Sequence, residues 1–138
     1  MKRIAVLASG NGSNLEAILQ AIDTGRIQNA RVVLVISDQE AAYALVRAEK
    51  RNIPCRVFRR QDYPSREAYD RALITLLKAE AIDLVVMAGF MRLVTPEFVA
   101  AFRNRIMNIH PALLPAFPGI RGVADALAYG VKVTGCTV

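Results

Sequence analysis

Cysteine and histidine are scarce in this chain of 138 residues, and no long apolar segment is present. Cys55 and Cys136 lie far apart, without CxxC spacing and without a neighbouring histidine, which excludes a disulfide framework and a zinc site of the usual spacing. The apolar runs are far shorter than the roughly 20 residues that span a bilayer, and the start lacks the apolar core of a signal peptide. We therefore expect a cytoplasmic protein whose chemistry requires no metal.

The composition, 54% hydrophobic and 22% charged, is typical of a globular chain that buries a core, and predicts one domain over residues 1–138. The formal charge of +6 comes from basic residues scattered among acidic ones. Only Arg56, Arg59 and Arg60 cluster, and no aromatic side chains interleave with them. This pattern favours an anionic small molecule over a nucleic acid as the ligand.

Short apolar runs alternate with segments of helical periodicity along the chain. Strands are expected at residues 4–8, 32–36, 55–58, 84–88 and 106–110, with helices after residue 13 and at residues 40–51, 66–79 and 122–129. Strands buried on both faces and joined by helices predict an α/β fold with a Rossmann-like, mostly parallel sheet. Such sheets bind ligands beyond the carboxyl ends of their strands.

The first strand is followed by the glycine-rich sequence SGNGSN at residues 9–14. Glycines let the backbone approach an anion, and the next helix presents free N–H groups, so Gly12, Ser13 and Asn14 are candidate phosphate ligands. The spacing matches neither GxGxxG nor a P-loop, which favours a single phosphate. The alternative is a capping box, in which Ser13 and Glu16 satisfy the helix start without a ligand.

Asn108 and His110 lie where the fifth strand ends, and a strand over these residues would place both side chains on one face. An amide donor beside a group that titrates near neutrality suits acyl or formyl transfer, where a carbonyl oxygen gains charge while a proton moves. The alternative is an asparagine that starts a turn and a histidine satisfied by the backbone. The residues alone leave both interpretations open.

Four motifs resemble the phosphoribosylglycinamide formyltransferase family, the folate-dependent enzymes of purine synthesis. They are SGNGSN at residues 9–14, SREAYD at 65–70, AGFMR at 88–92 and NIHPALLP at 108–115. The resemblance implies the formyltransferase fold and transfer of formyl from 10-formyltetrahydrofolate, as co-substrate, to the amine of glycinamide ribonucleotide.

The same resemblance implies roles for individual residues. Asn108 and His110 would be catalytic. The ribonucleotide and its phosphate would be bound by Gly12, Ser13, Asn14, Gly89 and Pro111. Folate would be bound by Arg66, Met91, Arg92, Leu93, Val94 and Asn108. No metal, nucleic acid or membrane is implied, and the protein would be a monomer or a homodimer.

Several folate-side residues also have simpler interpretations. Arg66 could be a solvated residue in the first turn of its helix, Phe90 and Met91 could be core residues, and Arg92 could pair with Glu97. Methionyl-tRNA formyltransferases and formyltetrahydrofolate hydrolases share the NIHP and LLP elements, so these elements do not identify the acceptor. A non-catalytic phosphate-binding or folate-binding fragment is the alternative of another class.

The chain departs from the family near its end. The family has an aspartate that orients the catalytic histidine, beyond a strand expected here from about Val131, and no aspartate of this chain matches it. Asp125 lies earlier, in the expected helix, and Arg121 stands where the family often has histidine. We therefore expect a chain that lacks its C-terminal portion and has reduced activity, with a mobile loop around Arg121.

Overall fold

The computed structural model describes residues 1–138, which divide into two compact units, Met1–Met107 and Asn108–Val138. The first unit holds the β-sheet and four α-helices, except that Asn108, the last residue of the last strand, is assigned to the second unit. The second unit holds one helix and extended segments. No helix of either unit is both long and apolar enough to cross a membrane.

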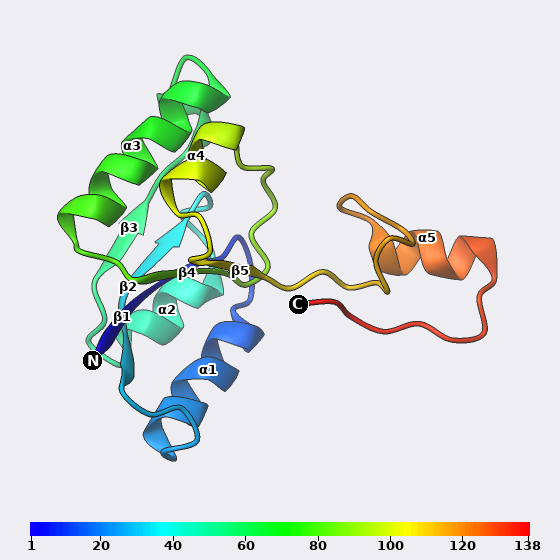
Figure 1. Cartoon of the computed structure of the whole chain (residues 1–138), viewed down its shortest axis with the longest axis horizontal. Coiled ribbons are helices and arrows are strands. Elements are labelled where there is room, and N and C mark those ends of the chain that lie inside the picture. Colours follow the sequence, from blue (N-terminus) through cyan, green and yellow to red (C-terminus); the bar gives the residue numbers. More distant parts are fainter. The chain divides into compact units, whose positions relative to one another are not determined.

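The first unit is an α/β structure in which strands and helices alternate along the chain (Figure 1). Its strands are β1 (Lys2–Leu7), β2 (Ala30–Ser37), β3 (Cys55–Val57), β4 (Leu84–Met87) and β5 (Ile106–Asn108). Its helices are α1 (Ser13–Asp23), α2 (Tyr43–Glu49), the 3-10 turn η1 (Arg60–Asp62), α3 (Arg66–Ala79) and α4 (Pro96–Ala101). The sheet order is β3-β2-β1-β4-β5, and β1 runs parallel to both β2 and β4. The predicted parallel α/β sheet is confirmed.

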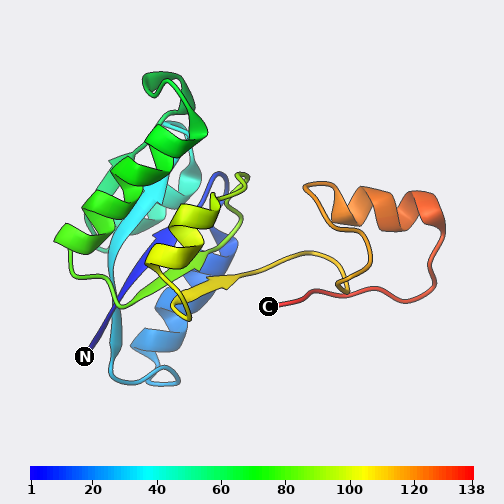
Figure 2. The same cartoon turned by 45° about the horizontal axis from the view of Figure 1, so that its top comes forward.

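Helices cover both faces of this sheet (Figures 1 and 2), and an apolar layer lies between the sheet and the helices on each face. Because side chains alternate along a strand, Ala5 and Leu7 of β1 face one layer while Ile4 and Val6 face the other. The first layer is completed by α3 and α4, and the second by α1 and α2. Burial on both faces explains why the central strands are almost continuously apolar.

Helix α3 occupies the residues predicted for it, because its start is fixed by a side chain. The hydroxyl of Ser65 accepts the N–H of Ala68 at 3.0 Å, which satisfies one free donor of the first turn. Tyr69, Leu73 and Leu77 are buried as the periodicity predicts. The helix expected over residues 40–51 is shorter at both ends, because α2 begins at Tyr43 and ends at Glu49.

The second unit contains α5 (Gly122–Tyr129), with the predicted bounds. Gly130 ends this helix with a φ of 86°, a conformation that favours glycine. The strand expected from about Val131 is wrong: residues 132–136 are exposed and unpaired, and only Thr137 forms an isolated antiparallel bridge with His110. The fifth strand also ends at Asn108 rather than His110. The two segments pair with each other only at the isolated bridge between His110 and Thr137, so neither continues as a strand.

Candidate functional site

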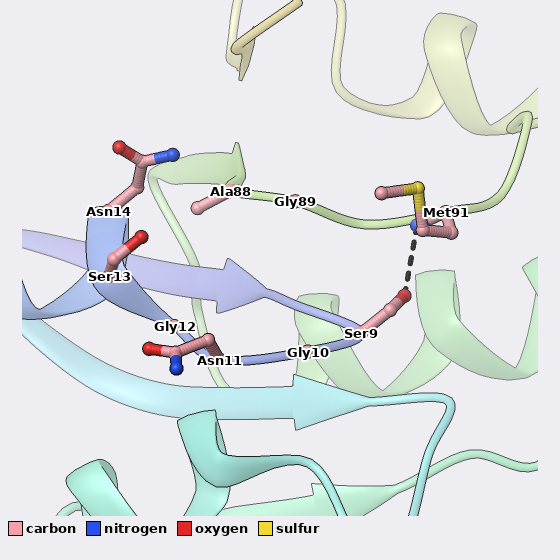
Figure 3. Close-up of a pocket in the computed structure, with 9 residues that line it drawn as sticks. All are labelled: Ser9, Gly10, Asn11, Gly12, Ser13, Asn14, Ala88, Gly89 and Met91. Carbon is pink, nitrogen blue, oxygen red and sulfur yellow. Dashed lines mark hydrogen bonds between the residues drawn. The ribbon is translucent and has the colours of Figure 1, made fainter. Parts of the chain in front are cut away.

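A pocket of about 230 Å³ lies where β1 and β4 end, in the first unit (Figure 3). The loop after β1 and the loop after β4 form its walls, at the edge of the sheet where parallel folds bind ligands. It is lined by Ser9, Gly10, Asn11, Gly12, Ser13, Asn14, Ala88, Gly89 and Met91. The structure thus brings Gly12, Ser13 and Asn14 together with Gly89 and Met91. The sequence prediction missed four lining residues that lie in the quoted motifs, Ser9, Gly10, Asn11 and Ala88.

Gly12 is the residue on which the shape of the first loop depends. Its φ is 77°, which side chains disfavour, and a Cβ placed there would lie 2.7 Å from the Cα of Ala44. Helix α2 also contacts this loop through the N–H of Ala44, which donates to the carbonyl of Gly10 at 3.1 Å. Only glycine at position 12 therefore allows α2 to approach the loop this closely.

The capping-box alternative for Ser13 and Glu16 is wrong. Gly12 is the N-cap, so Ser13 is already the first helical residue and no side chain caps α1. The Glu16 carboxylate instead accepts from Arg51 at 2.7 Å, and this hydrogen bond is the main reason that the pKa of Glu16 lies below its usual value.

The amide groups of residues 12–14 donate to no acceptor in the protein. They stand at the positive end of an 11-residue helix, the arrangement that binds phosphate and other small anions.

The loop after β4 is joined to the first loop through Ser9 (Figure 3). The N–H of Ser9 donates to the carbonyl of Gly89 at 3.0 Å, and its hydroxyl accepts the N–H of Met91 at 2.9 Å. Gly89 has a φ of 74°, a turn conformation that favours glycine. Phe90 is buried and belongs to the core, as its simpler interpretation predicts, whereas Met91 is 62% exposed and is not a core residue.

Arg92 lies over an aromatic ring rather than beside a carboxylate. Its guanidinium carbon is 3.9 Å from the ring centroid of Tyr69, a cation–π contact. The alternative pairing with Glu97 is wrong, because Glu97 pairs with Arg71 at 3.0 Å. Tyr69 is fully buried and donates its hydroxyl to the Phe58 carbonyl at 2.8 Å, and burial raises the pKa of Tyr69.

The rest of the predicted folate side consists of Leu93, Val94 and Arg66. Leu93 is 73% exposed, while Val94 packs against the core. Arg66 is the exposed first residue of α3 and has no carboxylate within 4 Å. It lines a second pocket, of about 360 Å³, with Arg60, Gln61, Tyr63, Pro64 and Ser65.

His110, Asn108 and Pro111 belong to the second unit. The Nε2 of His110 lies 2.8 Å from the carbonyl of Phe117, which can only accept, so Nε2 carries a hydrogen. Nδ1 has no hydrogen-bond partner in the protein. The backbone of His110 is held by two hydrogen bonds of 2.9 Å with Thr137. Asn108 and Pro111 are exposed, and no three His, Cys, Asp or Glu side chains form a metal ligand set.

Comparison with solved structures shows the same architecture. The structure is similar to glycinamide ribonucleotide transformylase 1 from Symbiobacterium toebii, with a TM-score of 0.94 and 52% identity over 99% of this chain and 64% of that one. It is equally similar in fold to phosphoribosylglycinamide formyltransferase from Bacillus halodurans, with a TM-score of 0.94 and 45% identity over 99% of this chain and 70% of that one.

Sequence comparison agrees. Phosphoribosylglycinamide formyltransferase of Mycobacterium tuberculosis strain H37Rv is 53% identical over 136 residues, which are 99% of this chain and 62% of the relative. The chain thus spans a little under two thirds of that relative's length. The formyl transferase family itself matches residues 2–138. The parallel sheet and the free amides at the start of α1 agree with this match. Because the match covers nearly every residue, the chain belongs to the formyl transferase family.

Proposed function

We propose that the protein transfers a formyl group from 10-formyltetrahydrofolate to the amine of glycinamide ribonucleotide, a step of purine synthesis. The observation that carries the proposal is the loop after β1. The free amides of residues 12–14 stand there at the start of α1, and Gly12 packs closely against Ala44. This arrangement suits a phosphorylated small acceptor. Two relatives whose alignments cover 99% of this chain have names that state this reaction. They are phosphoribosylglycinamide formyltransferase of Mycobacterium tuberculosis and glycinamide ribonucleotide transformylase 1 of Symbiobacterium toebii.

In this proposal the first unit binds both substrates. Gly12, Ser13 and Asn14 bind the phosphate, and Gly89 lies in the opposite wall of the same pocket. The amides of residues 92–94 donate to no acceptor in the protein and are available to the polar edge of the pterin ring. Arg66, without an ion-pair partner, is available to a carboxylate of the folate.

The second unit supplies the groups for the chemical step. The substrate amine attacks the formyl carbon, the Asn108 amide donates to the oxygen as it becomes negative, and protonated His110 stabilises the same charge. The C–N bond to the acceptor forms and the C–N bond to the folate breaks, while a proton passes from the amine to the folate nitrogen. His110 exchanges that proton at Nδ1, because the Phe117 carbonyl holds the Nε2 hydrogen. By the family resemblance, Pro111 is assigned to binding of the ribonucleotide.

The test is a competition between acceptors. Formyl transfer from 10-formyltetrahydrofolate is measured with glycinamide ribonucleotide, methionyl-tRNA and water present together. The proposal expects formylated ribonucleotide as the main product. Formyl-methionyl-tRNA as the main product would identify the tRNA enzyme, and formate would identify a hydrolase. Binding of the ribonucleotide without any turnover would identify a non-catalytic binding protein.

The proposal carries three further expectations from the sequence: a cytoplasmic location, no metal requirement, and a state of one or two copies. Analytical ultracentrifugation tests the last of these, and assay in the presence of a chelator tests the second. Neither nucleic acid nor a membrane is a partner in this proposal.

A further inference from the structure

Arg47 of helix α2 contacts the loop of residues 9–14, the phosphate loop, but does not line the pocket that this loop helps to form. Its Nε donates to the carbonyl of Asn11 at 2.9 Å, and its Nη2 donates to the side-chain oxygen of the same residue at 2.7 Å. A guanidinium that holds a backbone oxygen and a side-chain oxygen of one residue fixes that residue in position and orientation. Asn11 directly precedes Gly12 and the free amides of residues 12–14.

The same guanidinium is itself held on two sides. Nη1 lies 3.6 Å from the Glu16 carboxylate, and the planar group stands 4.8 Å from the centroid of the Tyr43 ring. Only 23% of the Arg47 side chain is exposed. A partly buried, doubly supported guanidinium loses little further freedom when it donates to Asn11.

The surrounding charges also keep the loop available to an anion. Glu16 lies in the first turn of α1, where a free carboxylate would repel a phosphate bound at the helix start. Arg51 donates to the Glu16 carboxylate at 2.7 Å, and Arg47 lies 3.6 Å from the same carboxylate, so two arginines neutralise it. Arg51 also pairs with Asp23. The four charges, Glu16 and Asp23 of α1 with Arg47 of α2 and Arg51 just beyond it, form one network.

We propose that Arg47 is a positioning residue for phosphate recognition: it holds Asn11, and thereby the backbone of residues 12–14, in the conformation that binds the ribonucleotide phosphate. This inference rests on the proposed function, because it assigns Arg47 to the substrate loop of that reaction. Arg47 contacts neither the reacting atoms nor the phosphate. Its loss therefore weakens binding of the phosphorylated substrate and leaves the chemical step unchanged.

The experiment compares Arg47→Ala with Arg71→Ala, which also removes one positive charge and one ion pair but lies on α3, away from the loop. Arg47→Ala should raise the KM for glycinamide ribonucleotide roughly 10- to 100-fold, as expected for lost hydrogen bonds from a charged donor, with kcat and the KM for the folate unchanged. Arg47→Lys keeps the charge but replaces the two guanidinium nitrogens that hold Asn11 with a single ammonium nitrogen, so it should give a smaller rise. Arg71→Ala should change neither constant.

Two further measurements separate positioning from a general effect on stability. The dephosphorylated analogue, glycinamide riboside, should bind Arg47→Ala and the unchanged protein equally in calorimetry, because only phosphate recognition depends on the loop. Asn11→Ala should raise the same KM by itself and add little to Arg47→Ala, because the two residues act as one unit. If Arg47→Ala does not fold, Arg47→Lys and Asn11→Ala carry the test.

The outcomes of the two proposals are distinguishable. An unchanged protein that fails to bind glycinamide ribonucleotide contradicts the proposed function, whatever the variants do. An unchanged protein that binds it, with Arg47→Ala and Arg47→Lys binding equally well, overturns the role of Arg47 and leaves the proposed function intact. Equal losses of affinity for the riboside and the ribonucleotide also overturn it.

Discussion

The two units differ sharply in how they hold their functional residues. In the first unit the phosphate loop is anchored by a parallel sheet with a buried layer on each face. In the second unit only three residues, Ala112, Gly122 and Ala126, are buried. His110 is held there mainly by polar contacts, through its bridge to Thr137 and its ring contact with the Phe117 carbonyl.

This difference separates the properties that each unit contributes. Burial of apolar side chains is the main stabilising contribution in folding, so the binding loop belongs to the stable part of the chain. The proposed catalytic residues belong to a part with few buried apolar contacts, which places them toward the low-stability end of a protein's range of local opening free energies. Binding and turnover should therefore respond differently to mutation in the two units.

The largest effect is expected in the second unit. His110→Ala and Asn108→Ala should each lower kcat about 100- to 1,000-fold, because each removes a donor to the developing oxyanion. Affinity for glycinamide ribonucleotide, measured by calorimetry, should stay within about twofold, because the phosphate loop is unchanged. Equal losses of affinity and turnover would contradict the division of labour between the units.

Gly12→Ala should produce the largest effect in the first unit. The added Cβ meets the Cα of Ala44 at 2.7 Å and stands on a positive φ, so the loop and α2 must move apart. The free energy of unfolding should fall by about 1–3 kcal/mol, measured by urea titration, and the KM for the ribonucleotide should rise. Gly25→Ala is the control, since its φ is 73° but no atom lies within 4 Å; it carries the backbone strain without the clash.

Thr137→Val tests how the second unit is held. The Thr137 hydroxyl donates to the Ala112 carbonyl at 2.7 Å and accepts the Leu114 N–H at 3.0 Å, and valine provides neither interaction. Amide exchange around His110 and Leu114 should accelerate roughly 5- to 30-fold, corresponding to about 1–2 kcal/mol of lost protection. Amides of β1 and β4 should exchange as before. A matching acceleration in those strands would show that the two units open together.

The smallest effect is expected for Glu16→Gln, and it depends on pH. Because the hydrogen bond from Arg51 lowers the pKa of Glu16 in the folded protein, the carboxylate stabilises the fold fully above its unfolded-state pKa. This stabilisation is lost as the pH falls through the folded-state pKa. At pH 7 the variant should be less stable by up to about 1 kcal/mol, and the difference should vanish in acid. Thermal unfolding across pH measures it, with Glu49→Gln, which has no ion-pair partner, as the control.

The sequence predicts those elements whose ends are fixed by local chemistry. Helix α3 begins after a serine cap, and α5 ends at a glycine with positive φ, and both have the predicted bounds. The strand expected from about Val131 is wrong because an apolar run becomes a strand only beside a partner strand, which is a property of the whole fold.

Site residues follow the same rule. The glycine-rich loop is recognisable from sequence because glycine and the following helix are local signals. The pairing of Arg92 with Tyr69 instead of Glu97, and the contact of Arg47 with Asn11, join residues 23 and 36 positions apart. No periodicity or spacing in the chain indicates either contact.

Ser9 has a consequence for how this protein can change. One residue provides both an N–H for the Gly89 carbonyl and a hydroxyl for the Met91 N–H, so the two loops that wall the pocket are tied at a common point. An insertion or a shift in one loop is transmitted to the other through that serine. Redesign of acceptor specificity would have to vary both loops together, because a changed loop must still fit the other loop, whose conformation matches the original sequence.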